Sequence, residues 1–386
     1  MKNHFFFSQP HQPFFVLAFM NAFLSMFLFM LMFKGIIATE LLGIKYHAYS
    51  FIFLMFTPAF LAFLFTTFPR FSATLPIAKE HYLKVFWLFL VGSILFQLGT
   101  LTSIFLVGMG MMLVLLASMF SGKLLLNIYT TSTINDKNDQ KWILIAIFFG
   151  LLSHLLFILS LWLPNLHTFS VQMAIYLYLF LVTFVVAQRM IPFFSNSPIK
   201  KEKEKFKVIV GLLAVHMALE SIQPHSSFLV DFFLVYIVGK ELYRWKLPFP
   251  NPNPLLWILH LALFWIPVAF LLSGISNFLT LYNGTNFLYM DIHGLLLGFL
   301  FTVLIGFGTR VTIGHSGNIM KADKWVILLF YWTQVVVIMR ILTSFAFANG
   351  WNFLLFFDIS VVVWLVMFGL WASRFFSVLI FGKKLN

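Results

Sequence analysis

Long apolar runs are the feature that most limits what this chain can fold into. Twelve of them follow one another along the 386 residues, and polar clusters bound each one. A helix needs about 20 predominantly apolar residues to cross the hydrocarbon core of a bilayer. The runs therefore predict an all-α polytopic bundle of about twelve transmembrane helices. Their approximate limits are 14–33, 46–68, 82–99, 101–120, 142–163, 171–190, 207–222, 226–241, 255–275, 288–309, 325–346 and 353–380.

Composition excludes the other broad classes of protein. Hydrophobic residues make up 61% of the chain and charged residues only 10%, so a water-soluble fold would expose too much apolar surface. Aromatic residues make up 19%, which excludes a disordered chain. We predict one integral membrane domain over residues 1–386 with no separate soluble domain. Its first apolar run is too long for a signal peptide and is predicted to be a retained span.

Two boundaries between predicted spans rest on short polar breaks. Gly99–Thr100 separates the third span from the fourth, and Gln223–His225 separates the seventh from the eighth. Short apolar runs also suit re-entrant segments, so ten or eleven spans remain possible.

Basic residues predict how the chain is oriented in the bilayer. The formal net charge is +13, which in a soluble protein would suggest nucleic acid as a partner. Here 22 of the 25 Lys and Arg residues lie in alternate segments, and the other three are Lys34, Lys45 and Arg340. Cytoplasmic loops carry such an excess, so we predict cytoplasmic amino and carboxyl termini and no nucleic-acid partner. The charged run 200–205 is predicted to be a solvated cytoplasmic loop.

The chain contains no cysteine, which restricts the chemistry that it can perform. Disulfides, thiolate catalysis, iron–sulfur clusters and Cys-ligated zinc are excluded. A metal or haem would have to be held by His, Met, Tyr, carboxylate or backbone groups. The sequence also lacks a phosphate-binding loop, a His-Glu-x-x-His motif and a nucleophile elbow, so no enzymatic reaction is predicted.

Ionisable residues inside predicted spans are the strongest candidates for function, because they are costly in lipid. With both termini inside, one set of them falls at the outer face. This set comprises His47, His225, Asp291, His293, Arg340 and Asp358. Imidazoles bind iron and copper, so the set predicts a cofactor site in which Arg340 neutralises a propionate or a carboxylate. The alternatives are that each histidine is an ordinary polar residue at the interface, and that Arg340 only pairs with Asp291 or Asp358.

A second set of candidates falls toward the cytoplasmic face. Its members are Arg189, His260, Arg310 and His315. About 25 Å of helix would separate His293 from Arg310. One haem cannot be held by both sets, so a model that uses both sets needs two separate centres. His154 and His216 are predicted near the middle of the membrane, as relays or ligands. Gly294 and Gly298 form a small-xxx-small pair, which predicts close helix packing along the tenth span.

Short motifs in a fixed order resemble the NnrS family of bacterial multi-helix membrane proteins. The resemblance extends over nearly the whole chain. The motifs are Pro13–Phe15, the His47 region up to Phe65–Pro69, Gln188–Phe194 (Q-R-M-I-P-F-F), Pro254–Leu261 (P-L-L-W-I-L-H-L), and His293–Gly294 followed by Thr309–Gly317 (T-R-V-T-I-G-H-S-G). One departure concerns the second span, which in the family usually opens W-H-A-H-E. Here Tyr49 occupies the position of the second histidine, either as a hydrogen-bonding group or as a substitute ligand.

The resemblance implies a protein of the bacterial inner membrane that contains haem and copper. It also implies a role in nitric oxide metabolism and resistance to nitrosative stress, with nitric oxide or metal–nitrosyl species as partners. The family has no settled reaction, so none is predicted, and the oligomeric state is not predicted either.

Three hypotheses follow from the residues and the resemblance together. In the first, an NnrS-like protein binds a metal or haem through His47, His293 and His260, with His315 as a further candidate. In the second, a transporter carries a small solute or metal ion along Arg340, His154 and His216. In the third, a membrane assembly factor uses its polar clusters only to hold helices together.

Overall fold

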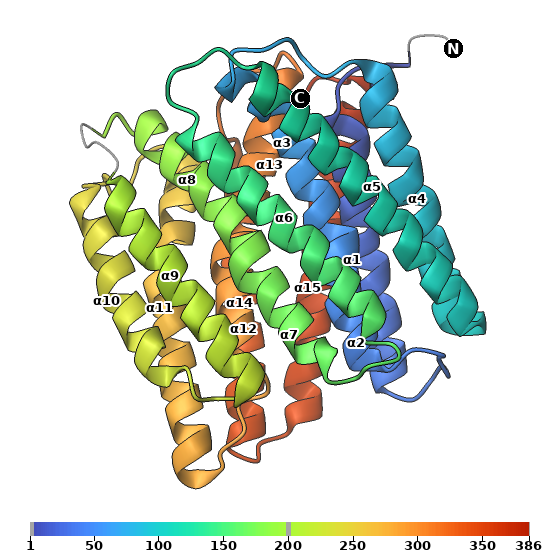
Figure 1. Cartoon of the computed structure of the whole chain (residues 1–386), viewed down its shortest axis with the longest axis vertical. Helices are drawn as coiled ribbons and strands as arrows, with labels where there is room; N and C mark the ends of the chain where they lie inside the picture. The colour runs from blue at the N-terminus through green and yellow to red at the C-terminus, as the bar shows by residue number, and fades with distance from the viewer. Residues whose placement is uncertain (1–3, 198–201, 386) are drawn as a thin grey trace. The chain divides into compact units, whose positions relative to one another are not determined.

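A computed structural model of the chain describes residues 4–197 and 202–385 (Figure 1). Helices make up most of the described chain, and these residues contain no β-strand. The elements are η1 (Phe5–Phe7), α1 (His11–Phe33), α2 (Gly43–Tyr49), η2 (Ser50–Phe56), α3 (Thr57–Phe71), α4 (Lys79–Thr102), α5 (Ile104–Thr131), α6 (Asn138–Leu159), α7 (Leu166–Met173), η3 (Ala174–Phe180), α8 (Leu181–Phe194), α9 (Lys203–Ile222), α10 (Phe228–Arg244), α11 (Pro254–Asn283), α12 (Met290–Leu295), η4 (Leu296–Phe301), α13 (Thr302–His315), α14 (Lys324–Ala348) and α15 (Phe353–Phe381).

Ten continuous helices of the described chain are long and apolar enough to cross a membrane. This supports a multi-pass helical protein, and ten of the twelve predicted spans meet this criterion, a number that the sequence leaves open. The two that fall short are α9 and α10, which correspond to the predicted seventh and eighth spans. α10 has only 17 residues, and α9 begins with the charged sequence Lys-Glu-Lys. Neither offers about 20 consecutive apolar residues, which is what a span requires.

The predicted break between the third and fourth spans is real and lies a few residues later. Ser103 is the single extended residue between α4 and α5, with φ −166° and ψ 125°. The two helices then pack against each other through glycines. A Cβ on Gly92 would lie 2.7 Å from the Val114 side chain, and a Cβ on Gly110 would lie 2.5 Å from the backbone nitrogen of Phe96. These helices can therefore approach so closely only because side chains are absent there.

Three of the long helices change their winding in the middle. The π-helical segments η2, η3 and η4 interrupt helices 43–71, 166–194 and 290–315. These are also the three most buried candidate spans: 94%, 89% and 83% of the most apolar stretch of each helix is buried inside the protein. Threonine hydroxyls cover carbonyls that the wider turns loosen: Thr57 donates to Ile52 and Thr302 to Leu297, each five residues back. Such π segments are rare and often lie near functional sites.

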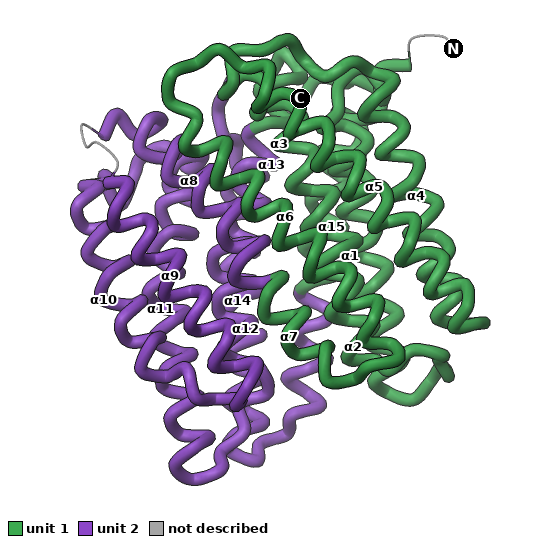
Figure 2. Tube along the Cα trace, in the orientation of Figure 1, with its two compact units in different colours: residues 1–174, 311–319, 364–386 green, residues 175–310, 320–363 purple. Residues whose placement is uncertain are grey.

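The chain divides into two compact units, shown in different colours in Figure 2. Unit 1 comprises Met1–Ala174, Val311–Ile319 and Trp364–Asn386. Its core is aromatic: the Phe19 ring lies 4.2 Å from the Trp371 ring and 5.1 Å from the Phe368 ring. The Trp364 indole donates to the Ala22 carbonyl, so α15 is tied to α1 by a hydrogen bond as well as by packing.

Unit 2 comprises Ile175–Arg310 and Met320–Val363. Within it, α11 packs against the helix that contains Gly294 and Gly298, as the small-xxx-small pair predicts. A Cβ on Gly298 would lie 2.7 Å from the Trp265 ring, whereas one on Gly294 would make ordinary contact with Ala269 at 3.6 Å. The Trp265 indole also donates to Gln334 at 2.8 Å, which joins α11 to α14.

The charged run 200–205 lies only partly within the described residues. Lys200 and Lys201 are outside them, and α9 begins at Lys203. Lys205 forms ion pairs with Glu202 at 2.8 Å and with Glu241 at 3.7 Å. The described end of the run is therefore helical and ion-paired to the end of α10, rather than a freely solvated loop. At that end of α10, hydrogen bonding to Glu241 raises the pKa of Arg244 above its ordinary value.

Backbone contact between α4 and α5 predicts that one methyl group suffices to disturb unit 1. In Gly110→Ala the new Cβ overlaps the α4 backbone, so we expect a loss of about 1–3 kcal/mol of stability. Gly108→Ala on the same helix is the matched control, because nothing lies within 4 Å of its Cβ and helix propensity improves by about 1 kcal/mol. Thermal unfolding in detergent, followed by tryptophan fluorescence, compares the two. Equal stability of both variants would contradict the close packing.

Candidate functional site

A pair of histidines in unit 1 is the closest approach of two imidazoles among the described ring contacts. His11, the first residue of α1, and His315, the last residue of α13, have ring centroids 4.8 Å apart at an interplanar angle of 54°. His11 is buried and His315 is half-buried. The buried Nδ1 of His11 has no hydrogen-bond partner. A buried polar atom without a partner is costly, which makes this atom a candidate for a ligand contact.

The residues before α1 fix the orientation of the His315 ring. Its Nδ1 lies 2.6 Å from the Gln9 Oε1, and because this oxygen only accepts hydrogen bonds, Nδ1 carries the proton. In the neutral ring the lone pair that can bind a metal is therefore on Nε2. Gln12 in turn holds Gln9, since its side-chain oxygen accepts from the Gln9 backbone nitrogen at 2.9 Å. Arg70 is close enough for its charge to act on both imidazoles.

The opening of the second span, also in unit 1, contains His47 and Tyr49. The half-buried His47 ring lies between the rings of Phe29 and Phe51, at centroid distances of 4.5 and 4.7 Å. Tyr49 points to a different set of neighbours, as expected for residues two apart on a helix. Its hydroxyl lies 2.9 Å from the Nε2 of buried His154. Tyr49 thus has a hydrogen-bonding role, one of the two roles that the sequence leaves open for it.

The segment at the end of α8 brings together part of the second predicted set, in unit 2. The His260 ring is fully buried and both of its nitrogens have partners: Nε2 lies 2.7 Å from Ser195 Oγ and Nδ1 lies 3.2 Å from the Pro248 carbonyl. The Arg310 guanidinium lies over the Phe194 ring at 4.2 Å. Arg189 is half-buried on the same helix α8. His315 of this set belongs to unit 1, with the partners described above.

Several residues of the predicted outer set gather in unit 2 around Arg340. Its guanidinium donates to the Leu288 carbonyl at 2.7 Å and to Ser344 Oγ at 2.6 Å. It also lies 3.1 Å from the Nδ1 of His293. Asp291 acts electrostatically on Arg340, although the direct contacts of the guanidinium are with neutral groups. The predicted gathering of Asp291, His293 and Arg340 is therefore present, whereas His47 lies in unit 1.

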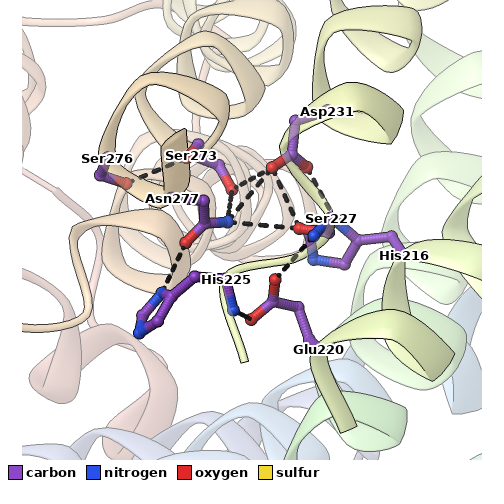
Figure 3. A network of polar contacts seen from close by, with 8 residues as sticks. All are labelled: His216, Glu220, His225, Ser227, Asp231, Ser273, Ser276 and Asn277. Atoms are coloured by element: carbon purple, nitrogen blue, oxygen red, sulfur yellow. Dashed lines mark hydrogen bonds and ion pairs between the residues drawn. The ribbon is translucent and has the colours of Figure 1, made fainter. Parts of the chain in front are cut away.

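His225 takes part in a second polar network of unit 2, formed by α9, α10 and α11 (Figure 3). Its Nδ1 lies 2.9 Å from Asn277 Oδ1, and its backbone nitrogen donates to Glu220. At the centre of the network the buried side chains of His216 and Asp231 are 2.7 Å apart. His216 is a sequence candidate, but its carboxylate partner is not.

Three important partners are not among the residues predicted from the sequence: His11, Asp231 and Gln9. His11 lies two residues before the Pro-Phe-Phe motif that begins at Pro13, and that proximity is the only local signal for it. Asp231 is an acid in the first turn of a short apolar helix, a signal that applies equally to a residue that only stabilises a helix end. Within the described residues, no group of three or more His, Asp or Glu is arranged to hold a metal ion.

A comparison with protein families matches the chain to the family described as NnrS protein. The match covers residues 5–381. No curated protein matches the chain.

The contact between Tyr49 and His154 predicts a non-additive effect on stability. Tyr49→Phe leaves a buried imidazole nitrogen unpaired, so we expect a loss of about 1–3 kcal/mol. His154→Leu alone leaves the tyrosine hydroxyl unpaired, whereas the double variant removes both polar groups. We expect the double variant to be less destabilised than the sum of the single variants, measured by thermal unfolding in detergent. Strict additivity would contradict a direct hydrogen bond.

Proposed function

The chain belongs to the NnrS family, and from that membership together with its buried imidazole pair we propose that it binds copper and acts in the response to nitric oxide. The observation that supports the copper site is the His11 Nδ1, buried without a hydrogen-bond partner beside the ring of His315. Family membership supports the link to nitric oxide metabolism and nitrosative stress. We assign no reaction.

The donor set of this pair fits a copper ion. Imidazole is a suitable ligand for copper, and a chain without cysteine has no thiolate to compete. Metal binding requires neutral rings, and the hydrogen bond to Gln9 leaves His315 Nε2 as the coordinating atom. A copper ion held by two imidazoles keeps coordination positions open for a small molecule such as nitric oxide.

The same pair does not fit a haem iron between its two rings. With metal–nitrogen bonds of about 2.0–2.1 Å, imidazoles on opposite sides of one metal have ring centres roughly 6 Å apart. The observed 4.8 Å is shorter and suits two ligands on adjacent positions of one ion. His260 is a poor haem ligand as well, because Ser195 and Pro248 occupy both of its nitrogens.

Any haem in this protein would therefore be held by other candidates. His293 lies beside Arg340, whose guanidinium is in contact with neutral groups and could neutralise a propionate. His47 is the corresponding candidate of unit 1, packed between two phenylalanine rings. We propose haem at either residue from the family relationship alone and derive no further step from it.

The proposed location is the bacterial inner membrane, with the amino and carboxyl termini in the cytoplasm. The ten apolar helices support a multi-pass protein in contact with lipid. The asymmetric placement of 22 of the 25 Lys and Arg residues supports the orientation.

Substitution of either histidine should release copper. We expect His11→Gln and His315→Gln to bind copper at least about tenfold more weakly than the unchanged chain, since each loses one of two protein ligands. Copper per polypeptide, measured by mass spectrometry after purification in mild detergent, together with the electron paramagnetic resonance of Cu(II), reports the result. Gln9→Ala should cause a smaller loss, because it only frees the ring of His315.

His81→Gln is the matched control, because His81 is an exposed histidine whose Nε2 lies 3.9 Å from the Glu80 carboxylate. It should keep its copper, and the thermal stability of all four variants should be compared. Copper that stays bound in both His11→Gln and His315→Gln, or its absence from the unchanged chain grown with copper, would refute the proposed site.

A further inference from the structure

The polar network formed by α9, α10 and α11 belongs to unit 2, whereas the residues proposed to bind copper belong to unit 1. Its central contact joins His216 on α9 to Asp231 on α10 (Figure 3). Both side chains are completely buried. Buried ionisable groups in membrane proteins are costly and mark functional sites more often than exposed ones.

The length of this contact requires a proton. The Nδ1 of His216 lies 2.7 Å from the Oδ1 of Asp231, which is an ion-pair distance, although the two atoms are not aligned as a regular hydrogen bond. A bare imidazole nitrogen and a carboxylate oxygen are both acceptors, and two acceptors repel each other at that distance. A proton on His216 turns the repulsion into attraction. The pair therefore holds at least one proton.

The surroundings of Asp231 place that proton on the imidazole. Its other oxygen, Oδ2, receives donors from three side chains: Ser273 at 2.8 Å, Ser227 at 3.2 Å and Asn277 at 3.3 Å. Donors on a carboxyl oxygen favour the ionised form. These donors stabilise negative charge on Asp231, so the imidazole of His216 is the better place for a proton of the pair.

The second nitrogen of His216 is a buried acceptor. Its Nε2 has no hydrogen-bond partner, and the Tyr176 ring of η3 lies 4.1 Å from the imidazole ring. A neutral His216 that keeps its proton on Nδ1 leaves a bare electron pair on Nε2. This atom can take up a second proton, and the carboxylate across the ring balances the resulting charge.

The charge of the neighbourhood also favours proton uptake. Glu220 of α9 and Asp291 of α12 are buried carboxylates that interact electrostatically with each other, and Asp291 also acts on His216 and His225. Asp231 is a third acid of this neighbourhood, and Arg340 of α14 interacts with Asp291. Protonated imidazoles would offset part of the negative charge. Uncompensated charge is expensive inside a protein, so the cluster favours bound protons.

We propose that His216 and Asp231 form a proton-holding site, in which Nε2 of His216 takes up and releases a proton inside the helical part of unit 2. Only the Nε2–H bond forms and breaks, and no electron is transferred. A site of this type donates or accepts protons for a reaction or a transport step inside the protein.

Nitrogen magnetic resonance of the full chain, labelled with ¹⁵N at histidine and reconstituted in lipid, tests the proposal directly. His216→Gln assigns the signals of this ring. We expect Nδ1 to keep its proton between about pH 5 and 8, while Nε2 changes from protonated to bare across the same range. In Asp231→Asn the ring should lose this preference and adopt the ordinary tautomer with the proton on Nε2.

Two further measurements keep the test independent of folding and of copper. In the unchanged chain, magnetisation transfer between histidine ¹⁵N and aspartate ¹³Cγ should identify the pair without any substitution. The His216 signals should be the same in His11→Gln, so a failure of the copper site leaves this result intact. A His216 ring that stays in one protonation state across the whole range, or that keeps a bare Nδ1, would overturn the proposal.

Discussion

Backbone polar groups inside a bilayer must find their partners within the protein, and the structure depends on this constraint. It explains why the described chain is helical, and also how the few buried polar side chains are arranged. In unit 1 the Asn21 amide donates to the Leu54 carbonyl and to Ser93, while Gln97 joins Tyr46 to Ser25. Such contacts connect helices far apart in sequence. The wider turns η2 and η4 obey the same rule, since a threonine hydroxyl covers a carbonyl that the turn loosens.

Much of this fold could be predicted, because the length and polarity of a segment decide whether it crosses a membrane. The helices α1, α6 and α14 lie close to their predicted limits, and the break between α4 and α5 is displaced by only a few residues. α10 is too short and α9 too polar to meet the criterion for a span, so the two weakest predicted spans are the two that the structure does not support. The π segments could not be predicted, since their sequences are as apolar as the helices around them.

The candidate sites were less predictable than the helices, for a physical reason. Hydropathy places a residue at a depth in the membrane, but packing decides which helices become neighbours. The sequence therefore identifies His315 as a candidate but not its neighbour His11, which lies near the other end of the sequence. Asp291, His293 and Arg340 gather as predicted, because the sequence places all three at the outer face, on helices that follow closely in the chain. The hydrogen bond from Tyr49 to His154 shows the same limit, since no local pattern links the two residues.

The partners of each ring nitrogen separate the roles of the buried histidines better than burial does. His260, His216 and His11 are all almost completely buried, yet their surroundings differ. His260 has partners on both nitrogens, which is the arrangement of a residue that holds a loop in place. His216 faces a carboxylate on one side and nothing on the other, which suits proton exchange. His11 lies beside a second imidazole and has an unsatisfied nitrogen, which suits a metal ion. One residue type in one apolar medium can thus serve three purposes, because in lipid the few polar neighbours decide which state of the imidazole is stable.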